Sequence, residues 1–381
     1  MTRKLVVLGA TGSIGSQTIQ VASALGLEIV ALAARSPSAK LAALSAEHPS
    51  ARVIAAGGSS NERQAFERMV GRPVEFDTDA VIDAARTPDT VVVNGIVGAA
   101  GLRATIAALE SGNRVALANK ESLVAGGPVV KRALSTHGGE LIPVDSEHSA
   151  LLQCLAGEDR DSVARLVLTA SGGPFRGRSR ESLADVTPEE ALAHPTWDMG
   201  RRITIDSATL FNKGLEVIEA HHLFDVDYDR IAVVIHPQSI LHSAVEFVDG
   251  SWKGHMGHPD MRIPIQYALT APGRAPSPAR PFDLAGLALT FETPDMATFP
   301  ALEIAYEAGR KGGSSPAVLN AADEVAVEAF LQRRLGFLGI ADVVSATLET
   351  VDWRPLATVE DVIAADREAR ATAASFVAGS C

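Results

Sequence analysis

The chain has 381 residues, of which 46% are hydrophobic and 21% are charged, and its formal net charge is −12. This composition is typical of globular proteins, and the length predicts two or three domains. The acidic balance argues against nucleic acid or an anionic membrane as a partner, although a local cluster of cations could still bind an anionic substrate. The chain has only two cysteines and no apolar leader, which predicts a cytoplasmic protein. It has no stretch of about 18 apolar residues, so no membrane span is expected.

Apolar segments alternate with helical stretches over residues 1–145. This alternation predicts an N-terminal α/β domain built on a Rossmann-like, doubly wound parallel sheet. Its expected strands are Leu5–Leu8, Ile29–Leu32, Val53–Ala55, Val91–Asn94, Val115–Ala118 and Leu141–Val144. Residues 146–270 mix strands with a helix and predict a central α+β catalytic domain. The expected elements there are a helix after Glu147, strands Ala164–Thr169, Ile231–Ile235 and Ser243–Phe247, and a helix near Ser207–Phe224.

The segment 271–298 begins with four prolines in eleven residues, which excludes a helix or a central strand and predicts a linker. Beyond it the apolar spacing is helical to the end of the chain, so residues 299–381 are expected to form a C-terminal α-helical domain. The expected helices are Ala301–Arg310, Pro316–Arg333, Ile340–Thr350 and Val359–Phe376.

Glycine recurs at every third position after the first expected strand, at Gly9, Gly12 and Gly15. A strand, a tight glycine turn and a helix N-terminus would cradle the pyrophosphate of a dinucleotide. The same glycines could also form a plain βα corner. Their place at the start of an alternating β/α region favours the dinucleotide interpretation.

The second expected strand ends in Ala34, Arg35 and Ser36, where an NAD enzyme would usually carry an acidic residue for the ribose hydroxyls. A guanidinium and a hydroxyl suit a 2′-phosphate instead, so we predict NADP(H) as the cofactor. The alternative is that Arg35 is a solvated loop charge.

Two carboxylates, Asp145 and Glu147, follow the apolar segment Leu141–Val144. If that segment continues as a strand, alternation points both side chains the same way. Two anionic groups side by side are costly unless a cation lies between them, and oxygen ligands suit a hard ion such as Mg²⁺ or Mn²⁺. We therefore predict a divalent metal site. Glu216 would add a third carboxylate and leave coordination positions open for a substrate.

Polar residues follow two further strands. Asn119, Lys120 and Glu121 come after Val115–Ala118, at the strand end that faces the ligand crevice in an open α/β sheet. Lys120 is placed to contact a substrate oxygen. Asn119 and Glu121 are placed to contact the cofactor or its ribose. The alternative is a helix N-terminus with a polar first turn.

Ser171 follows the strand Ala164–Thr169 in a glycine turn, which could be an anion nest or an ordinary turn.

The segment 207–216 has an apolar face at helical spacing, and Asn212 and Glu216 share another face of that helix. The functional interpretation is a phosphate grip by Ser207, Asn212 and Lys213, with Glu216 on the metal. The alternative is an i,i+3 surface salt bridge between Lys213 and Glu216, which would contribute little.

A segment with turn residues, a tryptophan and a methionine, residues 194–200, lies between two regular regions. We predict that this lid segment closes over a small ligand and excludes water. The alternative is a surface loop with Trp197 packed on the core.

Three histidines, His148, His236 and His255, are expected to be structural, because no zinc-type spacing joins them.

These blocks resemble the 1-deoxy-D-xylulose 5-phosphate reductoisomerase family, in order and over nearly the whole chain. The matching segments are 9–16, 119–124, 144–148, 171–175, 194–200, 206–209, 212–216, 236–239, 259–262 and 320–325. The resemblance implies an NADPH-dependent and divalent-metal-dependent rearrangement and reduction of 1-deoxy-D-xylulose 5-phosphate to 2-C-methyl-D-erythritol 4-phosphate, in the non-mevalonate route to isoprenoid precursors. It also implies a homodimer with three domains in each chain.

The resemblance further implies a role for each matching residue. The catalytic set would be Lys120 with the metal ligands Asp145, Glu147 and Glu216. The substrate-binding set would be Lys120, Ser146, Glu147, Ser171, His194, Trp197, Ser207, Asn212, Lys213 and Glu216. The cofactor-binding set would be Thr11, Gly12, Ser13, Ile14, Ala34, Arg35, Ser36, Asn119, Lys120, Glu121, Gly200 and Met261. The turn 34–36 departs from the Gly-Lys-Asn-like turn that the family often has.

Two other functions fit part of the pattern. An NADP-dependent dehydrogenase of the semialdehyde or homoserine type would also pair a Rossmann domain with an α+β domain, but would not require three metal carboxylates and a phosphate grip. A non-catalytic NADP-binding sensor would be expected to lack a carboxylate or Lys120, and this chain has all of them.

Overall fold

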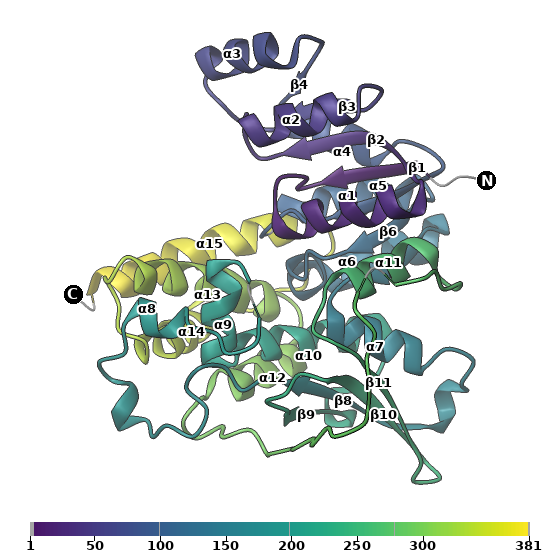
Figure 1. Cartoon of the computed structure of the whole chain (residues 1–381). Helices are drawn as coiled ribbons and strands as arrows, with labels where there is room; N and C mark the ends of the chain where they lie inside the picture. The colour runs from purple at the N-terminus through teal and green to yellow at the C-terminus, as the bar shows by residue number, and fades with distance from the viewer. Residues whose placement is uncertain (1–3, 99, 198, 278, 380–381) are drawn as a thin grey trace. The chain divides into compact units, whose positions relative to one another are not determined.

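The computed structural model of the chain describes residues 4–98, 100–197, 199–277 and 279–379. Pro278 of the predicted linker and Asp198 of the predicted lid segment lie outside these residues. The chain divides into two compact units that interleave along the sequence. The first comprises residues 1–122, 130–149 and 260–280, and the second comprises residues 123–129, 150–259 and 281–381 (Figure 1).

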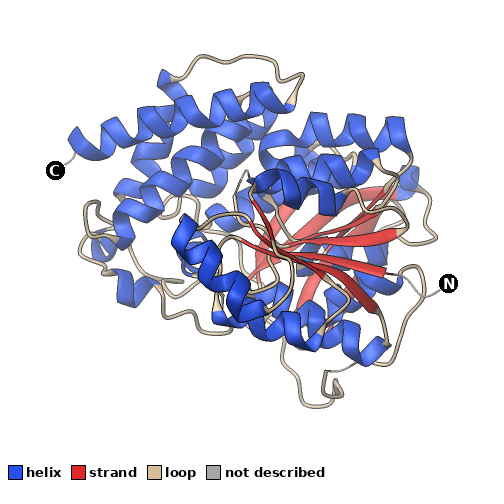
Figure 2. Ribbon diagram, turned by 90° about the horizontal axis from the view of Figure 1, so that it is seen from above, coloured by secondary structure: helices blue, strands red, loops and turns tan. Residues whose placement is uncertain are grey.

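The first unit is built on a seven-stranded parallel sheet in the order β4-β3-β2-β1-β5-β6-β7. Its helices cover both faces of the sheet (Figure 2). The strands are β1 (Lys4–Leu8), β2 (Glu28–Ala34), β3 (Arg52–Ala55), β4 (Glu75–Phe76), β5 (Thr90–Asn94), β6 (Arg114–Leu117) and β7 (Glu140–Pro143). The helices are α1 (Ser13–Leu25), α2 (Ala39–Glu47), α3 (Ser60–Val70), α4 (Thr78–Ala85), α5 (Ala100–Glu110) and α11 (Arg262–Thr270).

Continuous apolar runs explain the central strands, because a parallel strand covered on both faces has no solvent side. All five residues of β5 are buried, as are Leu5–Leu8 of β1. The strand order reverses between β1 and β5, so ligands are expected beside the carboxyl ends of these two strands. Gly9 and Asn94 stand at those ends.

The second unit carries a four-stranded mixed sheet in the order β11-β10-β8-β9. Strand β10 runs antiparallel to β8 and β11, and β8 runs parallel to β9. The strands are β8 (Val163–Ala170), β9 (Ile231–Ile235), β10 (Leu241–Phe247) and β11 (Trp252–Met256). The helices are α8 (Pro188–Ala191), α9 (Arg201–Thr209), α10 (Phe211–Phe224), α12 (Ala301–Lys311), α13 (Ser315–Leu331), α14 (Gly339–Thr350) and α15 (Val359–Gly379), with short 3₁₀ turns at Arg160–Ser162, Glu181–Leu183 and Tyr228–Arg230.

Two helices pass from one unit into the other. Helix α6 (Glu121–His137) is interrupted by a non-helical Gly126 and contains Pro128, which removes one backbone donor. Helix α7 (Ser146–Cys154) begins in the first unit and ends in the second.

The structure confirms the predicted fold class and every strand expected from the sequence. Two strands escaped prediction: β4, which has two residues, and β11, whose residues are mostly exposed. The single helix expected near Ser207–Phe224 is two helices, because Leu210 adopts a left-handed conformation at φ 70° and ends α9.

One hydrophobic core joins the mixed sheet of the second unit to its C-terminal helices, for instance through Leu166, Phe211, Leu302 and Phe330. The segment 260–280 belongs to the first unit and not to the second. The boundaries predicted from the sequence, at 145, 270 and 298, stay a prediction. No described helix is long and apolar enough to cross a membrane.

Candidate functional site

The glycine turn after β1 has the close backbone approach that a dinucleotide requires. Gly9 has a φ of +84°, and a Cβ on it would lie 2.6 Å from the carbonyl oxygen of Gly95. A Cβ on Gly15 would lie 2.3 Å from the carbonyl oxygen of Gly9. Gly12 is the N-cap of α1, and it has no side chain that could bind the first backbone N–H groups of the helix. These N–H groups therefore face the turn that contains Thr11, Ser13 and Ile14.

The predicted 2′-phosphate residues follow β2. Ala34 is the buried last residue of that strand, whereas Arg35 and Ser36 are exposed. Sequence reasoning missed a second cation nearby. The Lys40 Nζ atom, in the first turn of α2, donates to the Thr11 carbonyl oxygen at 2.8 Å and to Ser16 Oγ at 2.8 Å. No motif signalled this contact, because 24 to 29 residues separate Lys40 from its partners.

Asn119 and Glu121 are both buried and bind the loop that follows β5. The Asn119 Nδ2 atom donates to the Gly98 carbonyl oxygen at 2.9 Å and to Glu121 Oε2 at 2.6 Å. Glu121 Oε1 accepts from the Gly98 backbone N–H at 3.1 Å. Asn119 Oδ1 accepts from the backbone N–H of Ser122 at 3.1 Å. These contacts fix the turns after β5 and β6, so both side chains shape the crevice at the strand ends.

The strand argument for Asp145 and Glu147 was wrong, although the two carboxylates do lie close together. Strand β7 ends at Pro143, and α7 begins at Ser146. Asp145 Oδ1 accepts from the Glu147 backbone N–H at 3.1 Å, as an N-cap residue does. Glu147 lies in the first helical turn and accepts from Ser146 Oγ at 2.5 Å. Helix capping, and not strand alternation, therefore brings the carboxylates together.

Lys120 joins this cluster from the neighbouring strand end. Its Nζ atom lies 3.2 Å from Asp145 Oδ2, and the two side chains are 10% and 16% exposed. His148, which is fully buried, places Nδ1 at 3.1 Å from Asp145 Oδ1. One carboxylate oxygen of Asp145 lies within 4.8 Å of one of Glu147. Within the first unit, the structure thus confirms that Lys120, Asp145 and Glu147 lie together.

Ser171 and His194 form a hydrogen-bonded pair in the second unit. The His194 Nδ1 atom accepts from the backbone N–H groups of Thr196 at 3.1 Å and Trp197 at 2.9 Å. The ring proton therefore belongs on Nε2, which lies 2.9 Å from Ser171 Oγ and donates to it. Burial also lowers the pKa of His194 and favours this neutral ring.

The same Ser171 hydroxyl oxygen accepts from the Gly173 backbone N–H at 3.2 Å. With two donors on its oxygen, the hydroxyl hydrogen is left for a further acceptor, such as a phosphate oxygen. Gly173 has a φ of +66°, and a Cβ on it would lie 2.8 Å from the Ser207 carbonyl oxygen. The glycine turn 171–173 therefore packs directly on the backbone of α9 at Ser207.

Helix α10 presents three predicted site residues at its start. Asn212 Nδ2 donates to Glu216 Oε1 at 2.6 Å, and the Lys213 ammonium donates to Glu216 Oε2. The side chains of Lys213 and Glu216 are 5% and 1% exposed. The alternative of a surface salt bridge is therefore wrong, because this ion pair is buried. Glu216 belongs to a different unit from Asp145, so the three-carboxylate ligand set stays a prediction.

The lid segment lies between α8 and α9. Trp197 is half-buried, and its ring centroid lies 6.4 Å from that of His242. Met199 is half-buried, and Gly200 is the N-cap of α9. Met261, predicted to lie near the nicotinamide, packs on the core of the first unit, which also carries the glycine turn.

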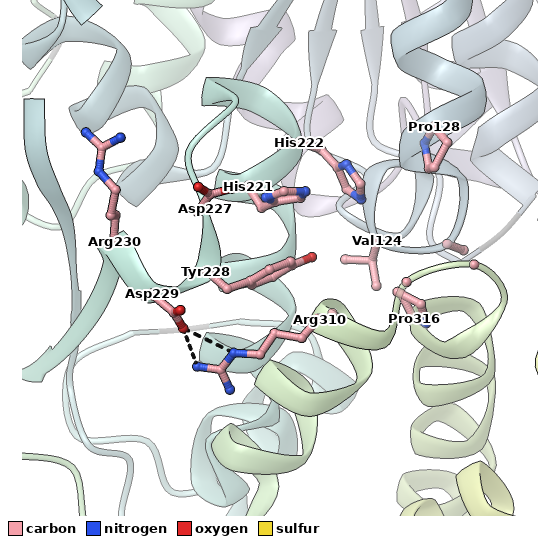
Figure 3. Close-up of a pocket in the computed structure, with 14 residues that line it drawn as sticks. Val124, Pro128, His221, His222, Asp227, Tyr228, Asp229, Arg230, Arg310 and Pro316 are labelled. Carbon is pink, nitrogen blue, oxygen red and sulfur yellow. Dashed lines mark hydrogen bonds and ion pairs between the residues drawn. The ribbon is translucent and has the colours of Figure 1, made fainter. Parts of the chain in front are cut away.

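A separate cavity of about 720 Å³ lies within the second unit, and no predicted site residue lines it (Figure 3). Its walls include Val124 and Pro128 of α6, and the Tyr228 ring stacks on His221 with centroids 4.3 Å apart. Asp229 and Arg310 form an ion pair of 3.0 Å at its edge. Since none of the predicted chemistry reaches this cavity, we assign it no part in the reaction.

Three family models match the chain in succession. They describe 1-deoxy-D-xylulose 5-phosphate reductoisomerase over residues 5–127, the C-terminal domain of that enzyme over residues 141–224, and the DXP reductoisomerase C-terminal domain over residues 256–372. The chain belongs to this family. The resemblance inferred from the sequence is therefore confirmed.

Relatives of the family match over almost the full length. The 1-deoxy-D-xylulose 5-phosphate reductoisomerase of Heliobacterium modesticaldum is 50% identical, with 97% of this chain and 96% of the relative covered. That of Ralstonia nicotianae is 48% identical, with 99% of each chain covered. These two matches thus span 97% and 99% of this chain.

Two solved structures share the fold. The reductoisomerase of Zymomonas mobilis in complex with NADPH has a TM-score of 0.92 at 43% identity and covers 99% of both chains. A DOX-P reductoisomerase in complex with NADPH, fosmidomycin and magnesium has a TM-score of 0.92 at 38% identity and covers 98% of both chains.

Proposed function

We propose that the clusters described above carry out the family reaction, in which NADPH and a divalent metal ion serve the conversion of 1-deoxy-D-xylulose 5-phosphate to 2-C-methyl-D-erythritol 4-phosphate. The observation that carries the proposal is the ion pair between the buried Lys120 and the half-buried Asp145, at 3.2 Å, beside Glu147 at the carboxyl ends of β6 and β7. This is the edge of the sheet where a dinucleotide fold binds its ligands.

The carboxylates of the first unit fit a hard divalent ion. The Asp145 and Glu147 oxygens lie within 4.8 Å of one another, and two oxygen ligands on opposite sides of one Mg²⁺ would be about 4.2 Å apart. Both donors are anionic oxygens, which suit Mg²⁺ or Mn²⁺. We propose Glu216 as the third ligand. When bound, the ion would polarise the substrate carbonyl and acidify its neighbouring hydroxyl.

Lys120 and Ser146 would hold the reacting end of the substrate. The Lys120 side chain is only 10% exposed, so its charge is little screened and would stabilise negative charge that develops on a substrate oxygen. Asp145 orients that ammonium from 3.2 Å. Ser146 begins α7, where the helix dipole adds positive potential.

We propose that the phosphate end of the substrate binds in the second unit. Ser171 Oγ accepts two hydrogen bonds, which leaves its hydroxyl hydrogen for a phosphate oxygen, and the Ser207 carbonyl oxygen lies beside the same turn. Asn212 and Lys213 supply an amide and an ammonium from the start of α10. A phosphate far from the reacting carbons provides binding energy that holds the reacting end in place.

NADPH would bind along the glycine turn of the first unit, with its pyrophosphate at the start of α1 and its 2′-phosphate near Arg35 and Ser36. We add Lys40 to this group, because its ammonium already lies 2.8 Å from the Thr11 carbonyl oxygen. Met261 and Gly200 would meet the nicotinamide end. NADPH supplies the hydride, and closure of the lid segment by His194 and Trp197 would exclude water.

A homodimer is proposed on the basis of the mixed sheet. Strand β11 is an edge strand, and it exposes Trp252 by 50% and Met256 by 40%. An exposed edge with apolar side chains is a ready surface for another strand, so pairing through β11 would cover it. Sedimentation of the wild type and of a Trp252→Lys variant tests this, and a monomeric wild type would refute it. The cytoplasmic location stays a prediction.

The decisive assay follows NADPH absorbance with 1-deoxy-D-xylulose 5-phosphate, with Mn²⁺ or Mg²⁺ and again with a chelator. Oxidation that stops with the chelator supports both the substrate and the metal-dependent reaction. Oxidation that continues in the chelator refutes the carboxylate metal site. No oxidation under any condition refutes the proposed reaction.

A further inference from the structure

A network of charged residues outside the predicted site surrounds Arg202 in the first turn of α9. Its guanidinium donates to three side chains of α13: Glu324 Oε1 at 2.8 Å, Asn320 Oδ1 at 3.0 Å and Asp323 Oδ2 at 3.2 Å. Asp206 Oδ2, one turn further along α9, lies 3.4 Å away. Asn320, Asp323 and Glu324 belong to the segment 320–325, a block that the proposed reaction leaves without a role.

The network is buried and extends to a third helix. Asn320 and Asp323 are fully buried, and the Arg202 side chain is 20% exposed. Burial raises the pKa of Asp323 to about 6, and the Arg202 guanidinium acts in the opposite direction. Glu324 Oε2 also accepts from Arg370 of α15 at 2.5 Å. Helix α9 is thereby tied to α13 and α15.

Helix α9 links two parts of the proposed substrate site. Its N-cap, Gly200, is the last residue of the lid segment, and Ser207 lies near its C-terminal end. Arg202 stands two residues after the lid, and Asp206 stands one residue before Ser207. A shift of α9 along or around its axis would displace both Gly200, where the lid segment joins the helix, and the Ser207 hydroxyl.

We propose that Arg202 is a positioning residue: held by Asn320, Asp323 and Glu324, it fixes α9 where Ser207 meets the substrate phosphate. This inference rests on the proposed phosphate role of Ser207. A network that served stability alone would leave phosphate binding unchanged in the folded variant. A positioning role therefore predicts a change in the phosphate inhibition constant, whereas a purely structural role predicts a change in the urea midpoint alone.

The test compares Arg202→Met and Arg202→Lys with Arg310→Met. The control removes an arginine of the same unit that pairs with Asp229 at 3.0 Å, outside the proposed site. For each folded variant one measures the inhibition constant of inorganic phosphate against the substrate, the KM of the substrate, the Kd of NADPH and the urea midpoint.

A misplacement of about 1 Å can cost on the order of 100-fold, so we expect Arg202→Met to raise the phosphate inhibition constant and the substrate KM by about 10- to 100-fold. The Kd of NADPH should rise by a smaller factor than either of these constants, because Gly200 is the one proposed cofactor residue that lies in the second unit. Arg202→Lys keeps the charge and should restore part of the affinity. Arg310→Met should match the wild type.

An unchanged phosphate inhibition constant in folded Arg202→Met, with a lowered urea midpoint, would overturn the inference and leave a purely structural network. If Arg202→Met does not fold, Asp323→Asn provides the same test, because it keeps the volume and one acceptor. Ser207→Ala separates the two proposals. If it leaves phosphate inhibition unchanged, the phosphate site itself is wrong; if it alone weakens inhibition, only the role of Arg202 is overturned.

Discussion

Replacing Lys213 by methionine should show how much the buried ion pair between Lys213 and Glu216 contributes to the free energy of unfolding. The Lys213 and Glu216 side chains are 5% and 1% exposed, so solvent screens the pair little. Removing one partner of a buried ion pair costs about 3–5 kcal/mol, since the remaining charge is left uncompensated. Without metal, Lys213→Met should therefore lower the free energy of unfolding by about that amount. The double variant Lys213→Met, Glu216→Gln should lose less, because it leaves no buried charge.

The measurement is equilibrium urea unfolding followed by circular dichroism, at one fixed protein concentration and with a chelator present. A double-mutant cycle should give an interaction energy of about 1.5–3 kcal/mol between the two side chains. Saturating Mn²⁺ should recover part of the loss in Lys213→Met, because a cation on Glu216 replaces the ammonium, and at 100 times its Kd it would supply about 2.7 kcal/mol. An interaction energy under about 0.5 kcal/mol would refute the buried pair.

Three shorter predictions concern the cofactor and the phosphate end. Gly15→Ala should destabilise the protein by about 1–3 kcal/mol through overpacking, and it should weaken NADPH binding in a fluorescence titration, because its Cβ would meet the Gly9 carbonyl oxygen at 2.3 Å. Arg35→Ala should weaken NADPH far more than NADH, and an equal loss for both would exclude a 2′-phosphate contact. Because burial lowers the pKa of His194, the unfolded chain binds the extra proton first, so stability should fall as the pH drops below about 6.5. In His194→Asn that part of the pH dependence should disappear from thermal unfolding curves.

Local patterns were sufficient for most of the fold. The run Thr90–Asn94 is apolar enough to be a strand buried on both faces, and Gly9 and Gly15 mark the turn after β1. Strand β11 was missed because it has Gly254 at its centre and because its residues are mostly exposed, so apolar and polar side chains do not alternate along it. The break at Leu210 was missed because leucine rarely adopts a positive φ, so only tertiary contacts impose it.

The candidate site shows where a correct prediction rested on a wrong reason. Asp145 and Glu147 were expected together because of strand alternation, yet they meet because Asp145 caps α7. The signal for the cap was present, since an Asp after Pro143 and before a helical run is typical of an N-cap. The hydrogen bond from His194 to Ser171 and the contact of Lys40 with Thr11 had no such signal, because they join residues 23 and 29 positions apart.

The position of Ser207 is set from two sides, and this leads to a last prediction. On one side, the turn at Gly173 approaches the Ser207 carbonyl oxygen so closely that a Cβ would lie 2.8 Å from it. On the other side, Arg202 is held by α13. Apolar side chains of similar volume would often stabilise this interior equally well, so stability alone does not account for the charged network.

Charge-assisted hydrogen bonds are directional, and three of them on one guanidinium fix both the rotation and the translation of a helix. If Gly173 and Arg202 act through the same displacement of α9, their effects on phosphate inhibition should not add. We expect the double variant Gly173→Ala, Arg202→Met to fall short of the summed single effects by at least about 0.5 kcal/mol. Simple additivity would mean that the two residues act on different parts of the site, and that α9 does not move as one body.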